Sequence, residues 1–186
     1  MKIFIKNMVC NRCISAVSKI FEDVGADAAK INLGEVELKS VISEETLRKI
    51  ENSLSENGFE RIKDSSVQLT EKIKNLIITE ISNLDISENF VLSEFLSSQL
   101  HKDYSLISKT FSQNENVTLE QYYILQKIEK VKEILFYNEF TLTEISAKLG
   151  YKSVQHLSAQ FRNITGFSPT EFKKLKINNR KALDLI

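Results

Sequence analysis

The sequence predicts an α+β protein in which a small βαββαβ domain precedes an all-α domain. Two observations predict this division. Segments of residues 1–63 alternate apolar and polar side chains with the period of a strand, whereas residues 67–175 show only the helical spacing of three and four. Gly also becomes rarer after the polar junction at residues 63–66, and Gly and Pro are nearly absent from the helical part. We therefore expect two domains, at residues 1–63 and 67–175, and a basic tail at residues 176–186.

The first domain is expected to contain four strands and two helices. Met1, Ile3 and Ile5 share one face of the first strand, and Gly34 is typical of a hairpin turn between the second and third strands. Two segments with apolar residues at helical spacing separate the strands. The elements are expected, in order, at residues 1–6 (strand), 13–21 (helix), 29–33 (strand), 36–39 (strand), 43–58 (helix) and 59–62 (strand).

The helical part contains an internal repeat. Each copy reads as a helix, a tight turn and a second helix, and the offset is 49 residues before the turn and 50 after it. Asn116 matches Gly166, which predicts a left-handed helix cap at both positions. The matching segments are residues 96–100 with 145–149, residues 106–111 with 156–161, and residues 117–122 with 167–172.

The second helix of the second copy has the character of a helix that enters a major groove. Val154, Leu157, Phe161 and Ile164 form one apolar stripe at steps of three and four. Small, amide and basic side chains occupy the remaining face, and such side chains read base edges. That face consists of Gln155, His156, Ala159, Gln160, Arg162 and Asn163.

A single long helix is expected between the copies, at residues 118–136. At about 1.5 Å per residue it is a rod of roughly 28 Å. Major-groove faces on one side of a duplex recur about every 34 Å. A rigid helix of this length therefore predicts two reading heads presented to one side of the DNA.

Residues 67–175 resemble the DNA-binding domain of the AraC family of bacterial regulators. That resemblance implies seven helices, with two helix-turn-helix units joined by a long helix, and binding to promoter DNA that activates or represses transcription. The ordered match is Ile145-Ser146-x-x-Leu149-Gly150-Tyr151, then Ser153-x-x-His156-Leu157-Ser158-x-x-Phe161-Arg162, then Thr165-Gly166-Phe167-Ser168-Pro169-x-x-Phe172.

This sequence departs from the family's pattern chiefly in the first unit. His101 stands where the family commonly has a turn glycine, Ser112 and Gln113 replace basic residues, Ala159 replaces a frequent arginine, and Lys127 replaces the arginine of the linking helix. Either the first unit binds DNA weakly, or it reads bases with little help from phosphate contacts. The DNA-binding residues that the resemblance implies are Ser153, Gln155, His156, Gln160 and Arg162 in the second unit, and Ser105, Leu106, Ser108 and Lys109 in the first.

Charge is distributed unevenly although the formal net charge is zero. Residues 137–186 contain eight Lys or Arg against four Asp or Glu, whereas residues 64–136 contain seven against eleven. We expect the C-terminal end to supply most of the attraction to phosphate. The tail lysines and arginine could instead be merely solvated, and His156 could be a surface histidine without a contact.

Both cysteines lie in one Cys-x-x-Cys pair, Cys10 and Cys13. In a reducing compartment such a pair indicates a metal site or a redox couple more than a structural disulfide. Residues 1–62 are similar to a heavy-metal-associated domain, a ferredoxin-like fold, through Met8-Val9-Cys10-Asn11-Arg12-Cys13 between the first strand and the first helix. That resemblance implies binding of a soft ion such as Cu(I) or Zn(II). The helix N-terminus and Arg12 are expected to lower the thiol pKa. Two thiolates suit a two-coordinate soft ion, whereas tetrahedral zinc would need ligands from a second molecule.

Two further readings of the pair remain: thiol redox sensing, and a motif without a ligand in a domain that serves docking or homodimer formation. The function expected for the whole chain is sequence-specific transcriptional regulation on double-stranded promoter DNA. Its alternative is a soft-metal carrier or chaperone with an accessory helical domain. A plain helical bundle for protein contacts is a third reading of the repeat.

Other classes of protein are not favoured. With 42% hydrophobic and 27% charged residues, the composition is that of an ordinary globular chain. No apolar run reaches the roughly 18 residues of a membrane span, and the lysine-interrupted N-terminus is unlike a secretory signal, so we expect a cytoplasmic protein without a membrane partner. The sequence contains no glycine-rich loop for phosphates and no Ser/His/Asp arrangement, so it does not predict an enzyme.

Overall fold

The computed structural model describes residues 1–175 and 181–183, and it is α+β as the sequence predicts. Its contacts divide the chain into two units, Met1–Asn75 and Leu76–Ile186. The division falls within helix α3 (Ser65–Asn83), whose first residues lie near the boundary expected from the sequence. Of the predicted basic tail, residues 176–180 and 184–186 lie outside the described part of the chain.

The first unit is built on a four-stranded antiparallel sheet with the strand order β2-β3-β1-β4. β1 lies between β3 and β4, so that Ile3 pairs with Val36 and Ile5 with Arg61. The elements are β1 (Lys2–Lys6), α1 (Asn11–Asp23), β2 (Ala28–Asn32), β3 (Glu35–Leu38), α2 (Glu44–Glu56) and β4 (Glu60–Ile62), followed by the first part of α3.

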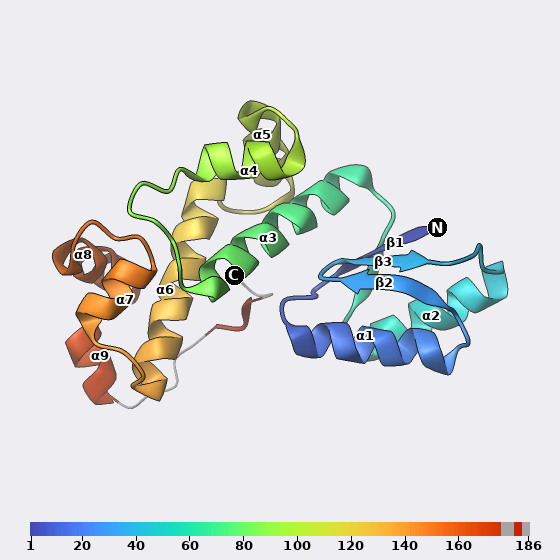
Figure 1. The fold of residues 1–186 in the computed structure, drawn as a ribbon, viewed down its shortest axis with the longest axis horizontal. Helices are drawn as coiled ribbons and strands as arrows, with labels where there is room; N and C mark the ends of the chain where they lie inside the picture. Colours follow the sequence, from blue (N-terminus) through green and yellow to red (C-terminus); the bar gives the residue numbers. More distant parts are fainter. Residues whose placement is uncertain (176–180, 184–186) are drawn as a thin grey trace. The chain divides into compact units, whose positions relative to one another are not determined.

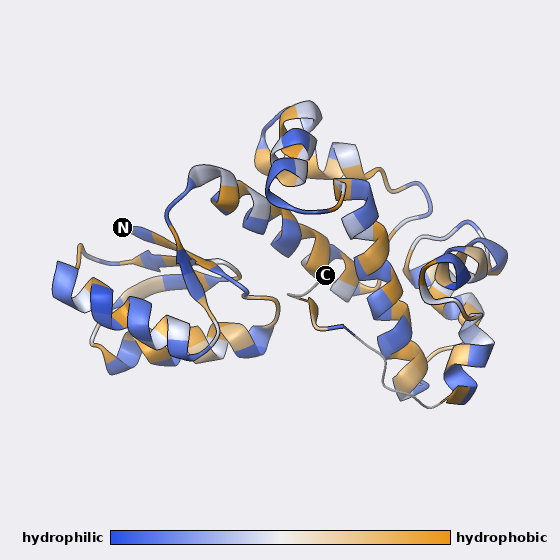
Figure 2. Ribbon diagram, turned by 180° about the vertical axis from the view of Figure 1, so that it is seen from behind, coloured by the Kyte–Doolittle hydropathy of each residue, from blue (hydrophilic) through white to orange (hydrophobic). Residues whose placement is uncertain are grey.

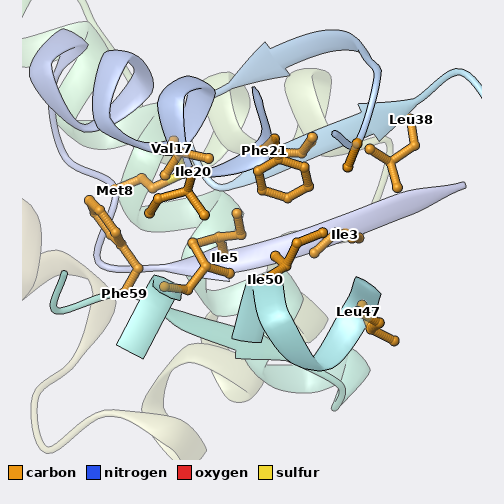
Figure 3. Close-up of a cluster of buried hydrophobic side chains, with 13 residues drawn as sticks. Ile3, Ile5, Met8, Val17, Ile20, Phe21, Leu38, Leu47, Ile50 and Phe59 are labelled. Carbon is orange, nitrogen blue, oxygen red and sulfur yellow. The ribbon is translucent and has the colours of Figure 1, made fainter. Parts of the chain in front are cut away.

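The core of this unit lies between one face of the sheet and helices α1 and α2 (Figure 3). Ile3 and Ile5 project from β1 toward Phe21 of α1 and Ile50 of α2, and all four side chains are buried. The alternation of apolar residues along β1 therefore places Ile3 and Ile5 on the face of the sheet that α1 and α2 cover. The first part of α3 packs elsewhere, because the ammonium of Lys72 lies 4.8 Å from the centre of the Phe4 ring.

The second unit contains two helix pairs, α4–α5 and α7–α8, which both pack on the long helix α6 (Figure 1). Most of its helices combine hydrophobic and hydrophilic residues, as expected for helices that bury one face (Figure 2). The elements after α3 are α4 (Leu92–Leu100), α5 (Tyr104–Asn114), α6 (Leu119–Tyr137), α7 (Leu142–Lys148), α8 (Val154–Thr165) and α9 (Pro169–Leu175). Within the described residues, no helix has the length and apolar character that crossing a membrane requires.

The internal repeat of the sequence recurs in the packing. Phe111 lies 5.2 Å from Tyr122 between ring centres, and Phe161, its counterpart in the second copy, lies 5.4 Å from Phe172. The helix that follows each pair is capped in the same way, since the hydroxyls of Thr118 and Ser168 accept hydrogen bonds from backbone N–H groups three residues later. The two copies therefore share one local structure.

The expected left-handed cap at Asn116 is wrong. Helix α5 ends at Asn114, and the backbone of Glu115 is extended. The Glu115 N–H donates to the carbonyl of Phe111 and the Asn114 side chain donates to that of Thr110, so the last carbonyls of α5 are satisfied without a left-handed residue. Gly166 does adopt the left-handed conformation, with φ of 82°.

Candidate nucleic-acid interface

Helix α8 presents an exposed polar face over a buried stripe. Its N-cap is Ser153, whose hydroxyl accepts a hydrogen bond of 3.1 Å from the backbone N–H of His156. Leu157 and Phe161 are fully buried, but Ile164, which the period assigns to the same stripe, is 37% exposed in the last turn. The exposed side chains are Gln155, His156, Ala159, Arg162 and Asn163.

Gln160, one of the residues predicted to contact DNA, forms a hydrogen bond within the protein instead. Gln160 is half-buried, and its Oε1 accepts a hydrogen bond of 2.7 Å from the hydroxyl of Tyr151. Ser153 is exposed but its Oγ caps α8, so it both fixes the helix start and lies on the accessible side. Gln155, His156 and Arg162 are all exposed, although His156 also contacts the Tyr151 ring and the charge of Arg162 acts on Glu171.

Tyr151 joins the linking helix to α8. This buried residue in the turn between α7 and α8 contacts His156 edge-on, with ring centres 5.5 Å apart. The ammonium of Lys127, on α6, lies 3.7 Å from the centre of the Tyr151 ring and 5.4 Å from that of Tyr123. Burial lowers the pKa of Lys127 to about 8. Sequence reasoning identified only the position of Lys127 in the long helix and missed this cluster.

Helix α5 has a buried apolar stripe like that of α8, but different side chains lie on its outer face. Ile107 and Phe111 are fully buried, as their counterparts in α8 are. Of the residues predicted to contact DNA, Ser108 is half-buried, whereas Ser105, Leu106 and Lys109 are exposed. An exposed leucine is unusual on such a face, and Leu106 is 49% exposed.

The turns that precede α5 and α8 differ in the space that they leave for a side chain. His101 ends α4 in the left-handed conformation with φ of 51°, and Gly150 follows α7 with φ of 64°. A Cβ on Gly150 would lie 2.7 Å from both Ile86 Cγ2 and the Ser87 carbonyl oxygen. The segment around Ile86 lies beside Leu149 and its N–H donates to the Lys148 carbonyl. Glycine is therefore required sterically at 150, while its counterpart at 101 tolerates a side chain.

The two thiols of the N-terminal unit lie together at the start of α1. Cys10 is the N-cap and is exposed, Cys13 is half-buried, and their Sγ atoms are 3.6 Å apart. Partial burial raises the pKa of the Cys10 thiol, but hydrogen bonds from Cys13 and Arg12 and the charge of Arg12 outweigh it, so that the pKa lies below its usual value. The nearby Met8 is fully buried in the core (Figure 3).

This thiol pair fits a soft ion. Two sulfurs 3.6 Å apart can both lie at about 2.3 Å from one ion with an angle of roughly 103° at the metal, close to tetrahedral. A linear two-coordinate ion would need about 4.6 Å between the sulfurs. Among the described residues no group of three or more Cys, His, Asp or Glu is placed to hold a metal, so further ligands would come from outside this set.

Comparisons with known proteins find similarities to the second unit. Residues 96–175, from within α4 to the end of α9, match the family model of a helix-turn-helix domain. No curated relative matches the chain. Similar solved structures include the C-terminal domain of AraT, a response regulator from Geobacillus stearothermophilus, at 19% identity and a TM-score of 0.50 over 61% of this chain and 91% of that one.

Two further similar structures each have a TM-score of 0.48. One is the C-terminal domain of the two-component response regulator yesN from Fusobacterium nucleatum, at 27% identity and a TM-score of 0.48 over 55% of this chain and 95% of that one. The other is a DNA-binding transcriptional dual regulator from Escherichia coli K-12, at 22% identity and a TM-score of 0.48 over 56% and 91%. Residues 96–175 thus form a helix-turn-helix domain, within a helical unit that has the fold of the AraT C-terminal domain.

Proposed function

We propose that this chain is a sequence-specific DNA-binding transcriptional regulator of the AraC type. One observation carries the proposal: two helix pairs, related by an internal repeat, each hold a helix with an exposed outer face on the common helix α6. Exposed amide and basic side chains on such a helix suit hydrogen bonds to base edges and phosphates. The similarity of residues 96–175 to a helix-turn-helix domain supports the same function.

The proposed contacts differ in kind between the residues. Gln155 and His156 lie near the start of α8, where a recognition helix reaches base edges. Arg162 lies two turns later, and we propose that it pairs with a phosphate. On α5, Ser105 corresponds to Gln155 and Lys109 to Ala159, and both α5 residues are exposed.

Selection of binding sites from random duplex DNA by the full chain tests the function. We expect enrichment of one sequence with two half-sites about one helical turn apart, because α6 separates the two helices. Genomic mapping of bound DNA should then recover the same sequence in promoters. Binding without any enrichment, or no binding at all at low salt, would contradict the proposal.

We further propose that the first unit is a heavy-metal-associated-like domain, with a ferredoxin-like fold, in which Cys10 and Cys13 hold a soft ion such as Cu(I) or Zn(II). Its support is the βαββαβ order with the strand order β2-β3-β1-β4, and the thiol pair at the start of α1. A bound ion would supply a fixed positive charge between the two thiolates. Tetrahedral coordination would draw ligands from a second copy, which makes a homodimer part of this proposal.

Competition of the full chain against a Cu(I) chelator tests the metal site. The Cys10→Ser, Cys13→Ser double variant should lose the affinity, and Met8→Leu should keep it, because the Met8 sulfur is buried in the core. Equal Cu(I) affinities of the wild type and the double-serine variant would mean that the pair holds no metal and belongs to a docking surface or a redox couple instead. Tight Cu(I) binding by a chain with no affinity for any DNA would favour a carrier instead.

A further inference from the structure

Leu106 stands out on the outer face of α5. It is 49% exposed in the first turn of the helix, with the exposed polar residues Ser105 and Lys109 on the same face. The next residue, Ile107, is fully buried and belongs to the core stripe. Leu106 is therefore an apolar side chain on the accessible side of a helix whose hydrophobic stripe is already complete.

The internal repeat gives Leu106 a counterpart of different chemistry in the second copy. Leu106 corresponds to His156 on α8, and both residues are exposed in the first turn of their helices, one position before a buried leucine or isoleucine. The backbone positions are thus equivalent, but the chemistry is not. His156 offers ring nitrogens to a partner, whereas Leu106 offers only carbon.

The C5 methyl of thymine is the one apolar substituent that a base presents in the major groove. The nitrogen and oxygen groups on the base edges there are hydrogen-bond donors or acceptors. A leucine side chain cannot form hydrogen bonds with those polar groups. Removing water from them without providing another hydrogen-bond partner would weaken binding. Its favourable neighbour in the groove is therefore the thymine methyl.

We infer that Leu106 makes the first helix-turn-helix unit selective for thymine, through contact with the 5-methyl group of one base. This inference rests on the proposed function and specifies what α5 reads. The two helices then recognise different groups on the bases. Helix α5 contacts a methyl group through Leu106, whereas α8 contacts polar base edges through Gln155 and His156. The selected site should consequently be asymmetric, with a required thymine only in the half bound by α5.

Replacement of each thymine of the selected site by deoxyuridine tests the inference, because this change removes only the methyl group. In the wild type one such replacement should weaken binding about fourfold, the contribution of one buried methyl. Leu106→Ala should bind the thymine and uracil sites equally. Leu106→Met, which restores an apolar side chain of similar size, should recover much of the preference.

A matched control is Leu175→Ala in α9, because Leu175 is also exposed, at 42%, and lies outside α5. It should keep the wild-type preference for thymine. If Leu106→Ala weakens binding to both sites by the same factor, or if no deoxyuridine affects the wild type, the inference is wrong although the protein binds DNA. If the wild type selects no site at all, the proposed function itself fails.

Discussion

The ammonium of Lys127 lies 3.7 Å from the centre of the Tyr151 ring, although Lys127 is only 6% exposed. A cation over the face of an aromatic ring is attracted by its quadrupole, and this attraction offsets part of the cost of burying the charge. Because Tyr151 also donates a hydrogen bond to Gln160, this cluster links α6 to helix α8. We expect it to fix the orientation of α8.

The first prediction concerns the pH dependence of stability. Burial lowers the pKa of Lys127 to about 8, below the value of about 10.5 that it regains on unfolding. Between these values the unfolded state binds more protons, so the free energy of unfolding rises with pH. Relative to Lys127→Met, the wild type should gain about 2 kcal/mol from pH 7 to pH 10. Urea unfolding at several pH values measures this difference.

The other ionisable groups of the cluster do not confuse this comparison. Burial raises the pKa of Tyr123 and Tyr151, the former with a contribution from the charge of Glu80, so both phenols stay protonated in the folded protein up to pH 10. Lys127→Arg provides the control, because a guanidinium stays charged throughout this range and should show no such rise. A rise in Lys127→Arg equal to that of the wild type would show that another group titrates.

The second prediction follows from the two left-handed turn residues. His101→Gly should raise the free energy of unfolding by about 0.5–1 kcal/mol, because a non-glycine residue pays a conformational cost at φ of 51° and the His101 side chain is exposed. Gly150→Ala should lower it by about 1–3 kcal/mol, since its Cβ would meet Ile86 and Ser87. Urea unfolding of the full chain measures both. Equal effects of the two changes would contradict this account of the turns.

The sequence predicted what depends on local periodicity and left out what depends on contacts between distant residues. The helix around Leu157 and Phe161 follows from spacing alone, and so does the alternation of Ile3 and Ile5 in β1. The need for glycine at 150 arises from Ile86, 64 positions earlier in the chain, and no local pattern contains that contact.

The same limit explains the errors at single positions. Asn116 was expected to be left-handed by analogy with Gly166, but hydrogen bonds of Asn114 and Glu115 close α5 before it. Gln160 looks like an outward amide by period, yet Tyr151 draws it inward. Both outcomes depend on particular hydrogen bonds, and the spacing of apolar residues does not predict such bonds.

The third prediction separates phosphate contacts from base contacts in α8. Arg162→Ala should weaken binding to all sequences alike and reduce the slope of log affinity against log salt by about one, because one fewer counterion is released. Gln155→Ala should instead relax specificity at one base pair by about 1–3 kcal/mol. Lys19→Ala, which removes an exposed charge from α1, is the control and should change neither quantity. Unchanged DNA binding in both α8 variants would mean that α8 is not the reading helix.

The last prediction joins the proposed metal site to DNA binding. The division between the two units falls within α3, so one continuous helix contributes residues to both. An ion at Cys10 and Cys13 changes the charge at the start of α1, and coupling between two such sites is typically about 1–3 kcal/mol, or 5–150-fold in affinity. We expect Cu(I) or Zn(II) to change the affinity for the selected site by a factor in this range in the wild type and to have no effect in the double-serine variant.

Thermodynamic linkage supplies an internal check on that measurement. The selected DNA must change the metal affinity by the same factor as the metal changes the DNA affinity, because the two routes to the ternary complex have the same total free energy. Chelator competition with and without the DNA measures the second route independently. Unequal factors would indicate that the metal acts elsewhere on the chain or on the DNA. Identical DNA affinities of wild type and double-serine variant, with and without metal, would leave the N-terminal unit a dimerisation or docking module.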